Sequence, residues 1–226
     1  MTGGVSDFST IEARALARCG SPAALAERLP TAKSPRALAR ITDDRWLAAM
    51  TRAVFRSGFV WRVVDAKWDG FEAAFRGFDT MACAMLSDED VEVLHADERI
   101  IRNGPKIRTV RENANFVRQI KDEHGSFARW VADWPGADIV GLWAELKARG
   151  ARLGGNTGPM MLRTMGKDTF ILTRDTSAGL VAAGVVDKAP SGKRALEKVQ
   201  AAFNGWQEET GRPLCELSRI LALSVN

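Results

Sequence analysis

The segment from residue 104 to residue 125, GPKIRTVRENANFVRQIKDEHG, limits the possible fold more than any other stretch of the chain. Its apolar side chains recur every three or four residues, which is the spacing of one face of an α-helix. These side chains are Ile107, Val110, Ala114, Val117 and Ile120. Pro105 near the start and Gly125 at the end fit the residue preferences of helix termini. The segment predicts a long amphipathic helix that needs an apolar partner surface.

Helical spacing also dominates the rest of the chain. Residues 43–58 place Trp46, Met50, Ala53 and Val54 on one face, and Asp43 or Asp44 is a plausible cap. Ser87 with Asp90 three residues later has the pattern of a capping box. Further helices are expected at 70–78, 137–150, 191–211 and 213–226. Sustained alternation and a βαβ rhythm are both absent, so we predict a compact all-α fold of roughly ten helices.

Composition narrows the class of protein. The chain has 226 residues, of which 46% are apolar and 27% charged, as expected for a globular protein with one large domain or two small lobes. The net charge of +4 permits a nucleic-acid partner without requiring one. No stretch is apolar enough to cross a membrane and the first residues lack a signal-peptide pattern, so we expect a cytoplasmic protein.

Cysteine and histidine are sparse. Cys19, Cys83 and Cys215 are odd in number and far apart, which argues against a disulfide framework. His95 and His124 are the only histidines, and the chain has no CxxC or HxxxH spacing. We therefore expect neither a metal nor another cofactor.

A glycine-rich turn lies at residues 152–159, RLGGNTGP. Gly154, Gly155 and Gly158 separate two helix-like segments, and Pro159 suits a first helical position. Glycines permit positive φ, and exposed N–H groups at a helix start favour an anion such as a DNA phosphate. A steric corner between two helices is the other interpretation of this turn.

Asp175 follows Gly158 by 17 residues. It begins the helix-like segment RDTSAGLVAAG, where an aspartate most often acts as the N-cap. Near a phosphate-binding turn it could also serve as a catalytic carboxylate. The two roles are compatible, because one oxygen can cap the helix while the other faces a substrate.

The segments LGGNTGP and GKDTFILTRDT together resemble the helix–hairpin–helix, glycine/proline-rich loop and aspartate motif of base-excision DNA glycosylases. Residues 43–79, 86–116 and 123–134 resemble, in that order, the DNA-3-methyladenine glycosylase I family. The likeness implies a helix–hairpin–helix glycosylase domain over 41–226, with the hairpin at about 152–165. It implies two lobes with a DNA-binding cleft between them, and residues 1–40 are expected to form a separate helical arm.

The resemblance assigns roles to particular residues. Asp175 matches the catalytic acid, and the three glycines of the turn match phosphate binders. Phe59 and Trp61 fall at the DNA wedge and at the aromatic wall for the damaged base, although Gly58 and Val60 could share the wedge. Trp46 is a second candidate for the wall. The candidate phosphate contacts are Arg102, Lys106, Arg163, Lys167 and Arg174.

Three positions depart from the family pattern. Ala53 stands where the family has a base-reading glutamate, which puts the lesion in doubt. The family's zinc clasp of cysteines and histidines is missing, which supports the expectation of no metal. Met160 occupies the position of the lysine found in lyase-competent relatives, so no Schiff base is expected.

The resemblance implies a monomeric, monofunctional glycosylase. It would flip alkylated bases out of double-stranded DNA, with 3-methyladenine as the expected lesion, and act in the cytoplasm at the nucleoid. Two alternatives stay open. One is a non-catalytic protein that binds distorted duplex, which the retained Asp175 disfavours. The other is a glycosylase for a different lesion, which Ala53 favours.

Overall fold

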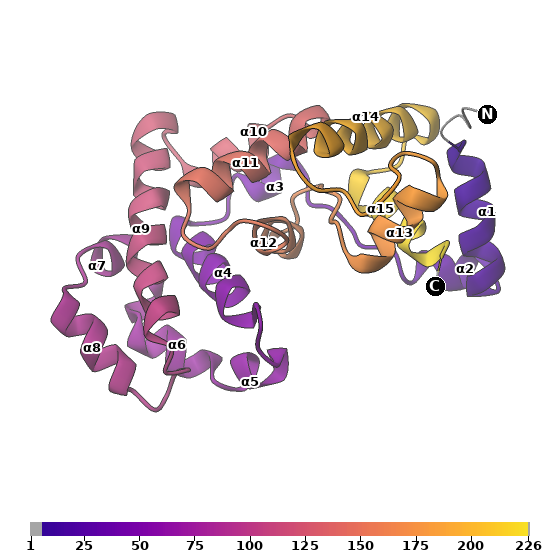
Figure 1. The fold of residues 1–226 in the computed structure, drawn as a ribbon. Coiled ribbons are helices and arrows are strands. Elements are labelled where there is room, and N and C mark those ends of the chain that lie inside the picture. The colour runs from indigo at the N-terminus through magenta and orange to yellow at the C-terminus, as the bar shows by residue number, and fades with distance from the viewer. Residues whose placement is uncertain (1–5, 226) are drawn as a thin grey trace. The chain divides into compact units, whose positions relative to one another are not determined.

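The computed structural model describes residues 6–225, and every regular element in that range is a helix (Figure 1). This confirms the predicted all-α class. The described residues form fifteen α-helices and two short 3-10 helices, more than predicted, because several expected turns fold into helices of four to seven residues. None of the described helices is both long and apolar enough to span a bilayer.

The chain divides into two compact units. The terminal unit contains the residues up to Lys33, residues 135–142 and the residues from Gly166 onward. The central unit contains residues 34–134 and 143–165. Each unit therefore combines segments that are distant in sequence.

Six helices belong to the terminal unit: α1 (Phe8–Cys19), α2 (Pro22–Ala26), η2 (Gly136–Asp138), α13 (Arg174–Ala182), α14 (Lys193–Thr210) and α15 (Leu214–Leu223). Helix α1 packs against α15 and buries Phe8, Ile11 and Ala15. The predicted arm over 1–40 is therefore not a separate element, because the apolar face of α1 is covered by the C-terminal helices. Residues 1–5 of that predicted arm lie outside the described range.

The central unit contains α3 (Pro35–Leu38), α4 (Asp43–Arg56), α5 (Trp61–Ala66), α6 (Trp68–Ala74), η1 (Arg76–Phe78), α7 (Thr80–Ala84), α8 (Asp88–Ala96), α9 (Gly104–His124), α10 (Phe127–Asp133) and α12 (Thr157–Met165). Helix α11 (Ile139–Arg149) begins in the terminal unit and continues into the central one. Helix α9 packs against α4, α7, α8 and α10 (Figure 1). Its predicted apolar stripe is fully buried, which confirms the long amphipathic helix.

Local signals set the ends of these helices. The Asn103 side chain accepts a hydrogen bond from the Lys106 amide at the start of α9, and Gly125 ends the helix at a φ of 78°. The predicted capping box of Ser87 and Asp90 is present at α8. On α4 the N-cap position is Thr42 rather than an aspartate, and Asp43 lies in the first turn, where the helix dipole favours a negative charge.

Residues 76–78 form a tight turn between α6 and α7. Arg76, Gly77 and Phe78 all have positive φ, at 53°, 65° and 61°. The conformation costs a non-glycine residue about 1–2 kcal/mol, so surrounding contacts must hold it. Phe78 is fully buried and stacks on Trp68 with 5.5 Å between ring centroids. The turn therefore fixes the position of the Trp68 ring.

Candidate functional site

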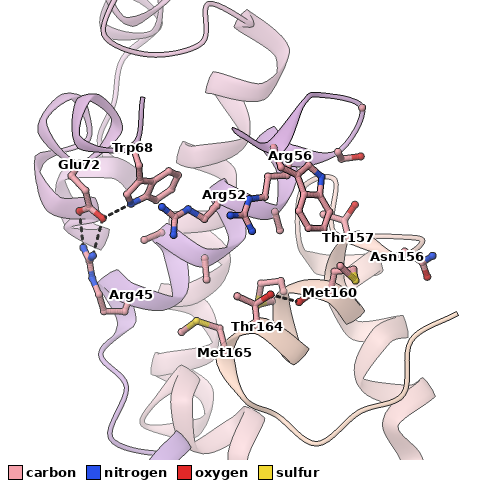
Figure 2. Close-up of a pocket in the computed structure, with 17 residues that line it drawn as sticks. Arg45, Arg52, Arg56, Trp68, Glu72, Asn156, Thr157, Met160, Thr164 and Met165 are labelled. Carbon is pink, nitrogen blue, oxygen red and sulfur yellow. Dashed lines mark hydrogen bonds and ion pairs between the residues drawn. The ribbon is translucent and has the colours of Figure 1, made fainter. Parts of the chain in front are cut away.

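A cavity of about 440 Å³ opens between α4 and α12, with further walls from α5 and α6 (Figure 2). Its polar lining comes from Arg45, Arg52, Arg56, Ser57, Glu72, Asn156, Thr157 and Thr164, and its apolar lining from Trp61, Trp68, Met160, Met161 and Met165 together with Ala48, Ala49, Ala53 and Gly58. All of these residues belong to the central unit. The volume lies in the range of small-molecule sites.

The cavity follows from the two faces of α4. Trp46, Met50 and Val54 are buried on the core side, as the periodicity predicts, whereas Ala53, expected on the same face, lines the cavity. Arg45, Arg52 and Arg56 are seven and four residues apart and therefore lie on a different side of the helix, facing the cavity. The alanines between them have short side chains, which leaves the space hollow.

A hydrogen-bonded network fixes one wall. Nη1 and Nη2 of Arg45 donate to Oε1 and Oε2 of Glu72 at 2.8 and 2.9 Å. The same Glu72 Oε1 accepts from Trp68 Nε1 at 3.0 Å. Figure 2 shows these three side chains joined along the wall. The hydrogen bonds that Arg45 donates to Glu72 raise the pKa of Arg45, so the guanidinium stays charged.

Arg52 has no comparable partner. Its guanidinium carbon lies 4.1 Å from the Trp68 ring centroid, and its buried Nε makes no hydrogen bond. The nearest carboxylate oxygen, Asp65 Oδ1, is 3.4 Å from Nε. Burial lowers the pKa of Arg52, although a guanidinium stays protonated at neutral pH. A charged group thus lines the cavity with unused donor capacity.

A second arginine lies over the other tryptophan. Arg56 places its guanidinium carbon 5.1 Å from the centre of the Trp61 ring. Its Nη2 donates to both oxygens of Asp65, at 2.6 and 2.7 Å. Each of the two aromatic rings that line the cavity therefore has a guanidinium within cation–π range.

Helix α12 supplies the opposite wall. Met160, Thr164 and Met165 point toward the arginines in Figure 2, and Thr164 Oγ1 donates to the Met160 carbonyl at 2.9 Å. Met161 is buried, whereas Met160 is only partly buried and lines the cavity. The position that could have carried a lysine is therefore occupied by an apolar thioether facing the site.

The residues predicted to contact a base are partly brought together. Trp61 lines the cavity and is 51% exposed. Phe59 and Val60, which precede Trp61 in the chain, are 40% and 65% exposed, so three consecutive apolar side chains are accessible here. Ala53 lines the cavity with only a methyl group. The roles of wall and wedge stay predictions.

Trp46 is not a base-contacting residue. It is fully buried and packs against Phe127, with 5.5 Å between ring centroids. Its spacing with Met50 and Val54 is that of the core face of α4. The cavity lies on the other side of the helix, so the prediction of a second wall at Trp46 was wrong.

The prediction that Lys106 contacts a DNA phosphate was also wrong. The side chain is buried, and Nζ donates to the carbonyls of Phe55 and Ser57 at 3.1 and 2.6 Å. Burial lowers its pKa. Because the ammonium group occupies the carbonyls at the C-terminal end of α4, it cannot also reach a phosphate on the surface.

The segment predicted as a hairpin consists of α11, a turn over 150–156, and α12, and its identity as a helix–hairpin–helix motif stays a prediction. Gly155 is exposed with a φ of 61°, which suits a turn glycine. Gly158 is different, because it lies inside α12 and its amide donates to the Leu153 carbonyl at 3.1 Å. That amide is not available to a phosphate, so Gly158 is a packing residue. Helix α12 begins at Thr157, so Pro159 is its third residue rather than its first.

The remaining cations are on the surface or partly buried. Arg102 is exposed beside Glu98, at 3.6 Å, and Arg163 is half-buried on α12. Arg174 is exposed on α13, and Lys167 is buried. Burial removes Lys167, which leaves the three arginines as candidate phosphate contacts. Their role stays a prediction.

Asp175 is the second residue of α13 and half-buried. The N-cap is Thr173, whose Oγ1 accepts from the Thr176 amide at 3.1 Å. The predicted capping role therefore belongs to Thr173. Asp175 belongs to the terminal unit and the cavity to the central unit. Its catalytic role stays a prediction.

Sequence reasoning did not single out Arg45, Arg52, Trp68 or Glu72 as site residues. A signal for the arginines exists, because they share one side of α4 with Ala48, Ala49 and Ala53. The fold and the cavity together define an all-helical protein with an aromatic, arginine-lined pocket large enough for one nucleobase.

Comparison with known proteins gives the family. The sequence model of the methyladenine glycosylase family matches residues 38–156, and the chain belongs to that family. Over 76 residues it is 33% identical to DNA-3-methyladenine glycosylase 1 of Escherichia coli (strain K12). That match covers 34% of this chain and 41% of the relative, so the chain spans less than half of the relative's length.

A solved structure shows the same fold. The structure described as the structural basis of 3-methyladenine recognition by 3-methyladenine DNA glycosylase I from Staphylococcus aureus superposes with a TM-score of 0.52. The match covers 65% of this chain and 86% of that one at 17% identity. Helix α4 and Trp61, Trp68 and Glu72 lie inside the family-matched segment, whereas Met160 and Asp175 lie beyond its end.

Proposed function

We propose that the chain is a DNA N-glycosylase that flips an alkylated base out of the duplex and hydrolyses its glycosidic bond. The observation that carries this proposal is the cavity of about 440 Å³ with Trp61 on its wall, built largely from the segment that matches the methyladenine glycosylase family. A base inside a duplex is inaccessible to chemistry at its sugar, so such an enzyme needs both a pocket and a wedge.

Phe59 and Val60 are the proposed wedge. Both are exposed apolar side chains directly before Trp61, and inserting such side chains between base pairs fills the space that the flipped nucleotide leaves. The Trp61 ring is then positioned to contact the flipped base from the side.

Asp175 is the proposed catalytic group. Loss of a base leaves positive charge on the deoxyribose, and a carboxylate near C1′ stabilises that charge and orients the attacking water. Met160 offers no amine for a Schiff base, so the products are a free base and an intact abasic strand.

The hairpin is proposed to bind the DNA backbone. Two helices joined by a glycine-containing turn also support membership of the helix–hairpin–helix superfamily. Gly154 and Gly155 lie on the turn between α11 and α12, and Arg102, Arg163 and Arg174 are the proposed phosphate contacts. We further propose that the protein acts as a monomer in the cytoplasm at the nucleoid.

The test uses duplex DNA treated with a methylating agent, and released bases are separated by chromatography. We expect release of 3-methyladenine or another methylated base, and a loss of about 10²–10⁴-fold with Asp175→Asn. Asp187→Asn, in an exposed loop, is the matched control and should leave release unchanged. DNA binding by both variants is measured alongside.

Two results would overturn parts of this proposal. Tight binding without base release from any alkylated duplex would make the protein a non-catalytic binder of distorted DNA. Strand nicking without alkali, trapped by borohydride, would show lyase chemistry and contradict the inference from Met160.

A further inference from the structure

The hydrogen-bonding capacity that the cavity offers is mostly that of donors. Three guanidinium groups line it, from Arg45, Arg52 and Arg56. Glu72 is the single carboxylate among the lining residues in the described part of the chain, and both of its oxygens are already bonded to Arg45. Ala53 adds only a methyl group. The charged groups that a bound base would meet are therefore donors, and the remaining polar groups, of Ser57, Asn156, Thr157 and Thr164, can donate or accept.

Arg52 is the donor least satisfied by the protein. Its two Nη groups make no hydrogen bond within the described residues, and its buried Nε has only the ion pair with Asp65 Oδ1 at 3.4 Å. A guanidinium that lines a cavity with unused Nη donors can bond to acceptor atoms of a bound molecule. The Trp68 ring holds the guanidinium by stacking from one side, at 4.1 Å. Figure 2 shows Arg52 between Trp68 and Arg56, above the α12 wall. Arg52 therefore lies where its guanidinium can donate hydrogen bonds to a base bound in the cavity.

The charge of the cavity disfavours a cationic base. The two tryptophan rings attract cations through their faces, but Arg52 and Arg56 already lie over them. A positively charged N3-methylated adenine nucleotide would enter beside two like charges in a partly desolvated space. A neutral base with acceptor atoms meets no such repulsion and supplies what Arg52 lacks.

We infer that this pocket selects a neutral 6-oxopurine, with Arg52 donating to the O6 and N7 acceptor pair of the flipped base. This inference rests on the proposed glycosylase function and names its substrate class. Arginine is the side chain whose paired donors fit two adjacent acceptors, whereas the 6-amino group of an adenine donates and conflicts with it. Hypoxanthine, a deaminated base, and 1-methylguanine, an alkylated one, share this acceptor edge.

The same contact assists the chemistry. Water adds its oxygen to C1′ and loses a proton to the catalytic carboxylate or solvent, while the N9–C1′ bond breaks and its electron pair goes to the purine. A neutral 6-oxopurine therefore leaves with a developing negative charge on N7 and O6, until a proton from solvent neutralises it. The Arg52 guanidinium stabilises that charge more than it stabilises the bound base.

Binding of free bases tests the inference without requiring catalysis. Quenching of tryptophan fluorescence by hypoxanthine, adenine and 3-methyladenine gives three dissociation constants. We expect hypoxanthine to bind about ten-fold more tightly than either adenine, which corresponds to about 1.4 kcal/mol for one bidentate contact. Arg52→Met should abolish the preference. Arg108→Gln, an exposed arginine of α9 paired at 3.4 Å with Glu92, is the matched control. If Arg52→Met does not fold, Arg52→Lys keeps the charge without the paired donors and should lose most of the preference.

Excision from duplexes with a single hypoxanthine, 1-methylguanine or 3-methyladenine separates this inference from the proposed function. Faster release of a 6-oxopurine that is slowed by Arg52→Met supports both the inference and the proposed glycosylase function. Reaction of the hypoxanthine duplex identifies a deaminated base as the substrate, and reaction of the 1-methylguanine duplex identifies an alkylated one. Release of 3-methyladenine with no binding or release of either 6-oxopurine overturns the inference and leaves the glycosylase intact. Arg52-dependent binding of hypoxanthine without release of a base from any duplex supports the assignment of the pocket and contradicts the proposed glycosylase function.

Discussion

Arg45 of α4 and Glu72 of α6 form a two-point ion pair, with Nη1 to Oε1 at 2.8 Å and Nη2 to Oε2 at 2.9 Å. The paired geometry is the strongest that a guanidinium and a carboxylate adopt. Glu72 also accepts from Trp68 Nε1, and Arg45 Nη2 donates to the Gly77 carbonyl at 2.7 Å. One carboxylate thus ties α4 to the wall that carries Trp68.

Glu72→Ala should lower the free energy of unfolding by about 1–2 kcal/mol, because it removes three hydrogen bonds from a partly buried network. Urea unfolding at neutral pH measures this change. Glu92→Ala is the control, because Glu92 and Arg108 are both exposed and exposed pairs contribute about 0–1 kcal/mol. Equal losses in the two variants would mean that the Glu72 network adds no stability.

Lys106→Met should destabilise the fold by about 1–3 kcal/mol, because the carbonyls of Phe55 and Ser57 lose their donor. A buried ammonium group contacts no phosphate, so the dependence of DNA affinity on salt should stay unchanged. Arg102→Met is the opposite case and should reduce the salt slope by about one with little loss of stability. Anisotropy of labelled duplex at several salt concentrations, with urea unfolding, measures both properties. A reduced salt dependence of DNA affinity in Lys106→Met would show that Lys106 contacts a phosphate after all.

The contrast between Lys106 and its neighbours shows what the sequence could predict. The stripe of α9 and the capping box at α8 depend on residues within one or two turns, so local spacing was sufficient. Lys106 is buried only because the end of α4, 51 residues earlier, lies over it. No local pattern carries that information, and a lysine beside an apolar stripe is normally solvated.

The cavity has the same dependence on long-range contacts. The arginine face of α4 is visible in the sequence, but its opposite wall is formed by α12, about a hundred residues later. Trp46 shows the opposite case. Its spacing with Met50 correctly predicted a position in the core, whereas the role assigned to it as a wall for the base was wrong. The catalytic role of Asp175 stays a prediction, because it depends on tertiary arrangement rather than on its own helix.

Gly158→Ala tests whether the hairpin glycine is a packing residue. A Cβ at this position would lie 2.6 Å from the Leu153 carbonyl oxygen and 3.2 Å from Leu146 Cδ1, closer than normal contact allows. We expect a loss of about 1–3 kcal/mol in the free energy of unfolding. Gly205→Ala in the middle of α14 meets no atom within 4 Å and should instead stabilise by about 0.4–1 kcal/mol. Unfolding curves that move in the same direction for both variants would contradict the steric argument.

Cys83 gives a prediction about alkaline pH. Its side chain is buried on α7, and burial, aided by Asp79, raises the pKa of the thiol from its ordinary value near 9 to about 12. Below pH 9 the thiol is protonated in both folded and unfolded chains and contributes no pH dependence. Between pH 9 and about 12 the unfolded chain loses the proton that the folded chain keeps. Stability therefore falls as pH rises, by about 1.4 kcal/mol per pH unit at most.

Cys83→Ala removes this dependence. The chain has no tyrosine, so phenol ionisation does not obscure the effect in this range. The wild-type protein should be the more stable of the two at pH 8, because the variant leaves a small cavity. Urea unfolding at pH 8, 9.5 and 10.5 should then show the difference shrinking and reversing as the wild type loses stability. A constant difference across these pH values would mean that the thiol ionises as readily in the folded protein as in the unfolded chain, and that burial on α7 does not protect it.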